Sequence, residues 1–214
     1  MGHNPNDIFP AERYGLITGS KCSVLFPKRS AEVGQRTYAK QLANNMFFQF
    51  YDEKGTWQTE HGQFSESSAF EFYQERFESA VEYQPKFARY ENWGGSADAI
   101  SPYRGIDFKC PTSLEGWLDY LHEGIKDQQY HQAQMYMMLY GREEWRICAY
   151  LLETNIMAES GLIYPVPIDR RMICIDVKKE IGWKEKLELA TPKIIQMRDE
   201  FYKHLKQQFD EIQN

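Results

Sequence analysis

Asp107 and Lys109 stand one residue apart in a stretch that alternates in the manner of a β-strand. Because strand side chains alternate between two faces, this carboxylate and this ammonium share one face, while Ile106, Phe108 and Cys110 share the other. An Asp-x-Lys pair on a half-buried edge strand is also a common ion pair, so the motif has low specificity when it is taken alone.

Asp98 ends the preceding predicted strand, residues 94–100. Pro102 and Gly105 favour a tight connection to the next strand, which places Asp98 beside Asp107 on neighbouring strands. Like charges at that distance raise each other's pKa and destabilise a sheet unless a cation lies between them. The two aspartates together therefore predict a bound metal ion.

Glu66 occupies the middle of the apolar stripe of the clearest predicted helix, residues 59–79. An unpaired carboxylate is costly at such a position. Small residues one turn away on either side let the helix approach a sheet closely enough for Glu66 to reach acids on the strands. A buried salt bridge to Arg89 or Arg104 is the alternative explanation.

Three carboxylates and one ammonium thus predict a metal centre made of Glu66, Asp98, Asp107 and Lys109. Carboxylate oxygens are hard ligands, which suit Mg²⁺ or Mn²⁺ better than zinc. The sequence has no cluster of His and Cys residues that competes with this site.

Other polar residues give weaker signals. Gln132 lies on the apolar stripe of a predicted helix over residues 126–140, where its amide needs partners, and a satisfied core amide is the plain alternative. Gln134 lies on the other side of that helix. Arg13 precedes a segment of glycines, hydroxyls and a helix start, residues 14–20, which suits a phosphate group; a surface arginine beside a capped helix explains the same pattern.

Composition narrows the classes of function. The 214 residues carry a formal net charge of −6 and no block of five basic residues, so bulk positive charge cannot hold nucleic acid. A polyanion needs arginines focused in a cleft or metal ions held by carboxylates. No apolar run is long enough to cross a membrane, and the N-terminus does not resemble a signal peptide. With four widely spaced cysteines, we expect a cytoplasmic protein with reduced thiols.

The candidate residues fall on an alternation of helices and strands. We expect helices at 20–26, 31–50, 59–79, 112–122 and 126–140, three strands of one meander between Ala80 and Cys110, and strands at 146–152, 163–168 and 173–175. The last helix begins at Thr191-Pro192, or near Trp183 if proline kinks a longer helix. This order predicts one α/β domain with a mixed sheet covered by helices.

The order and spacing of five motifs between about residues 13 and 150 resemble the lambda exonuclease family of viral recombination nucleases, also called the YqaJ family, within the PD-(D/E)xK nucleases. The motifs are Arg13-x-Gly-x-Ile-Thr-Gly-Ser20, Gly62-x-x-x-Glu66, Ser96-Ala-Asp98, Asp107-Phe-Lys109-Cys-Pro111 and Gln132-Ala-Gln134. The resemblance implies a restriction-endonuclease-like core at about 13–170, with a mixed central β-sheet flanked by α-helices and a C-terminal helix at about 184–212.

The resemblance also implies roles for individual residues. Two divalent metal ions, Mg²⁺ or Mn²⁺, are held by Glu66, Asp98, Asp107 and the carbonyl group of Phe108, and Lys109 orients and activates the attacking water. The 5′-phosphate and the DNA are bound by Arg13, Ser20, Ser96, Gln132 and Gln134. Two features differ from the best-known members: Asp107 replaces their glutamate, which is within the family's pattern, and Glu115 stands where a basic residue is expected.

The implied activity is a 5′→3′ exonuclease on linear double-stranded DNA with 5′-phosphate ends, which releases nucleotides and leaves 3′ overhangs for phage-type recombination by a single-strand annealing protein. The resemblance also implies a homotrimeric ring around DNA, and we expect the cytoplasm of a bacterial host as the location and no membrane partner. A related endonuclease or RecB-like repair nuclease is the alternative within the fold, although the spacing of Cys148 and Cys174 does not fit an iron–sulfur version. A non-catalytic DNA-end or protein-binding module is the alternative outside it.

Overall fold

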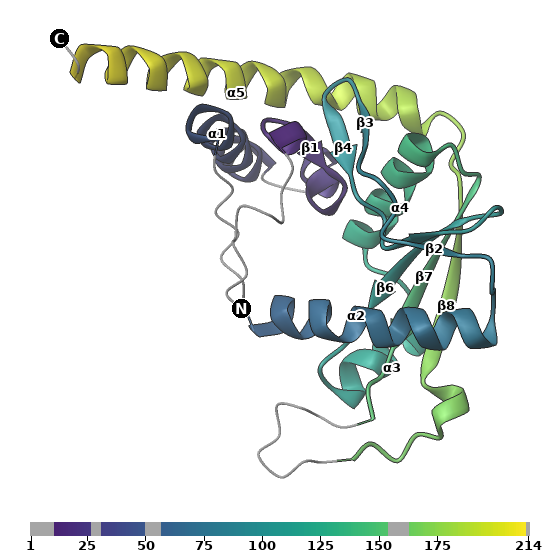
Figure 1. The fold of residues 1–214 in the computed structure, drawn as a ribbon. Coiled ribbons are helices and arrows are strands. Elements are labelled where there is room, and N and C mark those ends of the chain that lie inside the picture. Colours follow the sequence, from purple (N-terminus) through teal and green to yellow (C-terminus); the bar gives the residue numbers. More distant parts are fainter. Residues whose placement is uncertain (1–10, 27–30, 50–56, 154–162, 213–214) are drawn as a thin grey trace. The chain divides into compact units, whose positions relative to one another are not determined.

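The computed structural model describes residues 11–26, 31–49, 57–153 and 163–212 (Figure 1). The chain divides into two compact units, each made of segments that are distant in sequence. The first unit comprises Met1–Glu53, Arg89–Gly95 and Glu180–Asn214, and the second comprises Lys54–Ala88 and Ser96–Lys179. The single domain expected over residues 1–214 stays a prediction, and each unit is described by itself.

The second unit contains a five-stranded sheet in the order β2-β5-β6-β7-β8. The strands are β2 (Glu82–Tyr83), β5 (Ala99–Ile100), β6 (Gly105–Lys109), β7 (Glu144–Tyr150) and β8 (Met172–Lys178). Strands β6 and β7 are parallel, and the other neighbours are antiparallel. The sheet is therefore mixed, as the sequence predicts.

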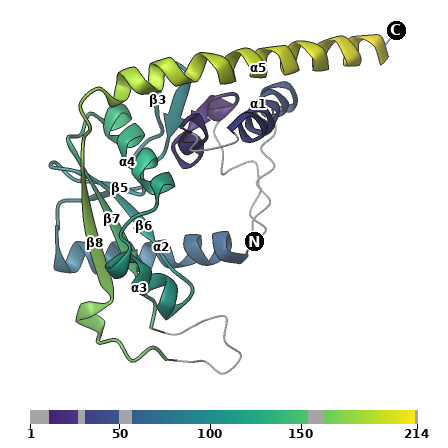
Figure 2. The ribbon, with the colours of Figure 1, turned by 180° about the vertical axis from the view of Figure 1, so that it is seen from behind.

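Helices cover both faces of this sheet (Figures 1 and 2). On one face, α2 (Trp57–Arg76) packs through Ala69 and Tyr73 against Phe108 of β6 and Cys148 of β7. On the other face, α4 (Asp127–Tyr140) packs through Ala133 and Tyr136 against Trp145 and Ile147, beside α3 (Leu114–His122). A short 3₁₀ helix, η4 (Ile168–Arg170), precedes β8. Apolar side chains of alternating strand positions thus fill two cores, one on each face.

Gly105 begins β6 at a place where a side chain has no room. A Cβ atom at this position would overlap ring carbons of Trp145, the partner of Gly105 in the parallel register of β6 and β7. The Trp145 ring is fully buried there. Glycine therefore lets the tryptophan cover the start of the strand that carries Asp107 and Lys109.

The first unit is built around two helices, α1 (Ala31–Phe48) and α5 (Trp183–Ile212). They lie side by side, and the Phe47 ring contacts the rings of Tyr202 and Phe209 with centroid distances of 6.0 and 5.0 Å (Figure 1). Also present are the 3₁₀ helices η2 (Ala11–Arg13) and η3 (Gly19–Leu25) and a three-stranded sheet of β1 (Ile17–Thr18), β4 (Trp93–Gly95) and β3 (Ala88–Tyr90).

The expected meander of three strands between Ala80 and Cys110 is wrong. This stretch forms five short strands that divide between two sheets: β3 and β4 join β1, whereas β2, β5 and β6 join β7 and β8. The pairing of β4 is parallel and non-local, with Ile17 opposite Trp93. Local alternation of apolar residues cannot report which distant strand a segment pairs with.

The structure also tests the strand expected over residues 163–168 and the start of the last helix. The expected strand over residues 163–168 is not formed: Ile163 is an isolated β-bridge residue, and residues 164–167 are irregular up to η4. The last helix takes the longer alternative, because α5 begins at Trp183 and contains Pro192. Thr191 does not cap it; its hydroxyl donates to the Leu187 carbonyl at 2.7 Å and accepts from Trp93 Nε1 at 3.0 Å.

Helix ends with explicit local signals are where the sequence places them. The Ser113 side chain accepts a hydrogen bond from the Gly116 amide and begins α3, and Gly141 ends α4 in the left-handed region at φ 62°. The segment predicted as a short helix over 20–26 is the 3₁₀ helix η3. No helix in the described ranges is both long and apolar enough to span a membrane.

Candidate active site

Asp107 and Lys109 lie in the interior of the sheet. Strand β6 runs between β5 and β7, so the alternative of an exposed ion pair on an edge strand is wrong. The Asp107 side chain is 2% exposed and the Lys109 side chain 27%, and Lys109 Nζ lies 2.5 Å from Asp107 Oδ2. On the face covered by α4, Gln132 Nε2 donates to Asp107 Oδ1 at 3.4 Å. The predicted carboxylate and ammonium therefore form a close ion pair on a central strand of the sheet.

Asp98 immediately precedes β5 and lies next to β6. The antiparallel register sets Ala99 opposite Ile106, so the next pair outward is Asp98 and Asp107. Asp98 Oδ2 accepts a hydrogen bond from the main-chain amide of Phe108 at 2.7 Å. The predicted approach of the two aspartates across neighbouring strands is confirmed.

Glu66 projects from α2 toward the same group of charges. Hydrogen bonds join its carboxylate to Tyr83 and Gln84, and its charge interacts with those of Asp107 and Lys109. The Tyr83 ring is held by stacking on Phe70, one turn after Glu66 in α2, with centroids 4.5 Å apart and an interplanar angle of 26°. Strand β2 and helix α2 thus position Glu66 together.

Arg104, one of the two expected salt-bridge partners of Glu66, has other partners. It pairs with Glu78 at 3.1 Å, Glu144 at 2.5 Å and Asp176 at 3.1 Å. The cation that acts on Glu66 is Lys109. Arg89, the other candidate, is exposed and belongs to the first unit.

The cluster has three carboxylates, and Lys109 is the ammonium group beside them. Burial raises the pKa of Asp98 well above its usual value, and the charges of Asp107 and Glu66 raise it further. Burial likewise raises the pKa of Glu66, against the hydrogen bonds from Tyr83 and Gln84. Burial opposes the charge of Lys109, but Asp107 and Asp98 outweigh it and raise the pKa of the ammonium. The cluster therefore favours a further cation.

The potential ligands suit a hard divalent cation, because they are carboxylate oxygens. Among the residues that the structure describes, however, no group of three or more His, Cys, Asp or Glu side chains converges closely enough to hold a metal ion. Lys109 lies against the Asp107 oxygen instead. The two-ion site, including the Phe108 carbonyl as a ligand, stays a prediction whose donor chemistry fits.

The predicted phosphate-binding residues lie in different places. Gln132 is buried and reaches Asp107, whereas Gln134 is 1% exposed and donates through Nε2 to the Lys178 carbonyl at 2.8 Å. Ser96 directly follows β4 and belongs to the second unit. Arg13, in η2, and Ser20, in η3, belong to the first unit, so their part in this site stays a prediction.

Two tyrosines near the carboxylates were not singled out from the sequence. Tyr136 is buried and hydrogen-bonded to Gln132, and burial with the charges of Asp107 and Asp98 raises its pKa. Its spacing of four residues from Gln132 on one helix is a signal that could have found it. Burial and the Glu66 carboxylate raise the pKa of Tyr83 to about 12. No sequence pattern marks Tyr83, because its position depends on the pairing of β2 with β5.

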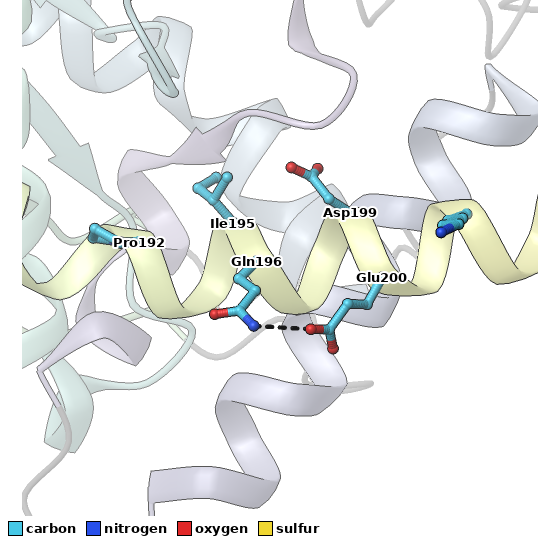
Figure 3. Close-up of a pocket in the computed structure, with 6 residues that line it drawn as sticks. Pro192, Ile195, Gln196, Asp199 and Glu200 are labelled. Atoms are coloured by element: carbon cyan, nitrogen blue, oxygen red, sulfur yellow. Dashed lines mark hydrogen bonds between the residues drawn. The ribbon is translucent and has the colours of Figure 1, made fainter.

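A surface pocket lies elsewhere, on α5 of the first unit (Figure 3). Its wall is one stretch of that helix, with a hydrogen bond of 2.9 Å from Gln196 Nε2 to Glu200 Oε1. The lining residues are Pro192, Ile195, Gln196, Asp199, Glu200 and Lys203. None of them is a predicted site residue, so the candidate active site is defined by the carboxylate cluster of the second unit.

Solved structures share this fold of a mixed sheet flanked by helices. The chain is similar to an alkaline exonuclease from Laribacter hongkongensis, with a TM-score of 0.75 and 16% identity over 94% of this chain and 97% of that chain. A complex of that exonuclease with dAMP gives a TM-score of 0.73 and 17% identity over the same shares.

A phage-related exonuclease from Haemophilus somnus 129PT is also similar, with a TM-score of 0.72 and 18% identity over 91% of this chain and 96% of that chain. No protein-family model and no curated protein sequence matches the chain. The structural likeness establishes the fold, which agrees with the resemblance to the lambda exonuclease family.

Proposed function

We propose that this protein is a metal-dependent DNA exonuclease. The observation that carries the proposal is the cluster of Glu66, Asp98, Asp107 and Lys109, in which burial and mutual repulsion raise the pKa of Asp98 and of Glu66. Such a cluster costs stability, which is typical of a functional site and not of a structural one. Its place in a fold shared with two exonucleases supports hydrolysis of phosphodiesters in DNA.

The chain's own residues have distinct tasks in this reaction. Glu66, Asp98, Asp107 and the Phe108 carbonyl would hold two Mg²⁺ or Mn²⁺ ions, which supply charge for the phosphoryl oxygens and lower the pKa of water. Lys109 is an ammonium at neutral pH, because the aspartates raise its pKa. It therefore acts as a hydrogen-bond donor and a charge that favours hydroxide over water, and it orients the nucleophile.

We propose that the phosphate-binding residues determine the direction of hydrolysis along the DNA and the kind of DNA end that the enzyme accepts. Gln132 contacts Asp107, so an amide that binds a terminal phosphate would be directly connected to the metal-binding carboxylate. We propose that Gln132 and Ser96 of the second unit bind the 5′-phosphate of linear duplex DNA, with Arg13 and Ser20 as the further phosphate-binding residues that the family resemblance implies. Hydrolysis then proceeds 5′→3′ and leaves a 3′ overhang, the substrate of a single-strand annealing protein in phage-type recombination.

A closed ring would let an acidic chain keep hold of a polyanion. The net charge of −6 opposes binding through the whole surface, so we propose a homotrimer that encloses the DNA. Light scattering tests this: the expected particle mass is three times the chain mass of 25.3 kDa. A mass of one chain at micromolar concentration would overturn the ring.

The activity is tested with three DNA substrates: linear duplex with 5′-phosphate ends, the same duplex with 5′-hydroxyl ends, and closed circular duplex. Each is incubated with Mg²⁺ or with a chelator, and released nucleotides are measured. We expect nucleotides from linear DNA with Mg²⁺ only, released faster from phosphorylated ends. Cleavage of closed circular DNA would show that the protein is an endonuclease. Inactivity of the folded protein on all three substrates would overturn the proposal.

Lys109→Met supplies the matched test of the site. This substitution removes the ammonium group and keeps most of the apolar side chain. We expect the rate of nucleotide release to fall at least about a hundredfold, as it does when a group that assists catalysis by acid–base or electrostatic effects is removed. Lys178→Met is the control, since Lys178 is a largely exposed lysine of the same unit that pairs with Glu144. Equal losses in both variants would show that the effect is not specific to the site.

A further inference from the structure

Cys148 and Cys174 face each other across two antiparallel strands. Cys148 lies in β7 and Cys174 in the edge strand β8, and the register sets the two residues directly opposite. Their Sγ atoms are 3.4 Å apart, and both thiols are free. The pairing of the two strands therefore holds the two sulfurs close together.

The backbone geometry of this pair fits a covalent link. Directly opposite residues in an antiparallel pair have Cα atoms about 4.5–5.5 Å apart, within the range of about 4.4–6.8 Å that disulfides span. The sulfurs have to approach to about 2 Å, which rotation of the two side chains can supply. The register of β7 and β8 therefore meets the Cα requirement for a disulfide.

The surroundings differ for the two thiols. Cys148 is fully buried in the core between α2 and the sheet, beside Phe108. Cys174 is half-buried at the rim of that core. The hydrogen bond with Cys148 lowers the pKa of Cys174, as do the nearby charges of Arg146 and Arg104, against burial and the charge of Asp176. Cys174 is thus the more reactive and more accessible partner.

We propose that Cys148 and Cys174 form a redox-active dithiol, a modification site that a hydroperoxide converts into a disulfide between β7 and β8. The Cys174 thiolate attacks one oxygen of hydrogen peroxide and becomes a sulfenic acid, and the displaced hydroxide takes up a proton to form water. The Cys148 sulfur then attacks the Cys174 sulfur; the S–S bond forms, and the sulfenic oxygen leaves as water with the Cys148 proton. Two thiols are oxidised, and one peroxide is reduced to two waters.

This dithiol is a different pair of groups from the carboxylate cluster of the proposed nuclease site. Cys148 faces the core beneath α2, whereas Gln132 of α4 contacts Asp107 from the opposite face of the sheet. The other two cysteines provide internal controls: Cys22 is buried in η3, and Cys110 follows Lys109 at the end of β6.

The test uses the folded full-length protein with a small molar excess of hydrogen peroxide. Remaining thiols are alkylated under denaturing conditions, and tryptic peptides are identified by mass spectrometry. We expect a linked peptide pair that contains Cys148 and Cys174, a loss of two of the four alkylatable thiols and full reversal by dithiothreitol. Free alkylation of both residues after oxidation, or links to Cys22 or Cys110 instead, would overturn the proposal.

Variants separate the two roles. In Cys148→Ser the sulfenic acid on Cys174 has no resolving thiol, so we expect labelling by dimedone at least tenfold above that of the wild type. Cys22→Ala is the matched control and should form the same link as the wild type. Labelling of Cys148→Ser no higher than that of the wild type would contradict the order of attack. The linked peptide of the wild type tests the site even if Cys148→Ser does not fold.

Discussion

The side chain of Asp98 accepts a hydrogen bond of 2.7 Å from the main-chain amide of Phe108, the residue between Asp107 and Lys109. This bond fixes a carboxylate of the segment before β5 against the middle of β6. It also brings Asp98 next to Asp107. Burial and the charge of Asp107 disfavour the ionised form of Asp98, and its pKa is raised for that reason. Function and stability therefore make opposite demands on Asp98.

Asp98→Asn should remove activity and stabilise the metal-free protein. Asparagine keeps an oxygen that can accept from the Phe108 amide, and it removes the repulsion by Asp107 and Glu66. We expect a higher free energy of unfolding at neutral pH, because a desolvated and repelled carboxylate is replaced by a neutral amide. Urea denaturation with a chelator present measures it.

Asp169→Asn is the matched control for this substitution, because Asp169 is exposed in η4 and its replacement should change stability by less than about 0.5 kcal/mol. A loss of stability in Asp98→Asn would show that attraction holds the cluster together, which contradicts a net repulsion among its carboxylates.

Tyr83→Phe should weaken the site without unfolding it. The phenylalanine ring can still stack on Phe70, but Glu66 loses a hydrogen bond. We expect activity to require about tenfold more Mg²⁺ for its half-maximal rate, the usual effect of removing a group that orients a metal ligand. Tyr103→Phe, at a residue that is 76% exposed, should leave the Mg²⁺ dependence unchanged. An unchanged Mg²⁺ requirement in Tyr83→Phe would remove Tyr83 from the site.

Gly105→Ala should destabilise the second unit strongly. The new methyl group would overlap the buried Trp145 ring, so β6 or the ring has to move, at a cost of at least about 3 kcal/mol. Gly34→Ala is the control, since no atom lies within 4 Å of its added carbon in α1, and the change should stabilise that helix by up to about 1 kcal/mol. Thermal unfolding of both variants compares them; equal melting temperatures would contradict the packing described.

Asp176 gives a prediction for the acid limb of the stability curve. The hydrogen bond from Arg146, with help from Arg104, lowers the pKa of Asp176 below its usual value. Its charged form therefore stabilises the folded state at pH values above about 4, and that contribution disappears as the pH falls toward the lowered pKa. Asp176→Asn should be less stable than the wild type at pH 7, and the difference should shrink on acidification. A difference that stays constant with pH would exclude this linkage.

The sequence predicted those parts of the fold that depend on neighbouring residues. The cap at Ser113, the left-handed Gly141 and the strand around Asp107 follow from short-range chemistry, and all three are present. The division of residues 80–110 between two sheets was missed, because it depends on β1 and β7, which lie far away in sequence. Pro192 left two starts open for the last helix, and the longer one is correct, because α5 begins at Trp183 and contains the proline.

In the candidate site, too, the sequence predicted contacts between neighbouring segments and missed those that depend on distant ones. Asp98 and Asp107 could be paired because a tight turn joins their strands, and the structure confirms the pairing. Tyr83 was not predictable, since its contact with Glu66 exists only when β2 pairs with β5 and α2 crosses beside them. Gln134 shows the limit of motif reading, because its amide binds the Lys178 carbonyl in a buried position.

The most direct test of the metal centre is a calorimetric titration of the protein with Mn²⁺. We expect saturable binding by the wild type, binding at least about tenfold weaker in Asp107→Asn, and unchanged binding in Asp169→Asn. Equal affinities of the wild type and Asp107→Asn, or no binding by the folded wild type, would contradict the assignment of this carboxylate cluster as a metal centre.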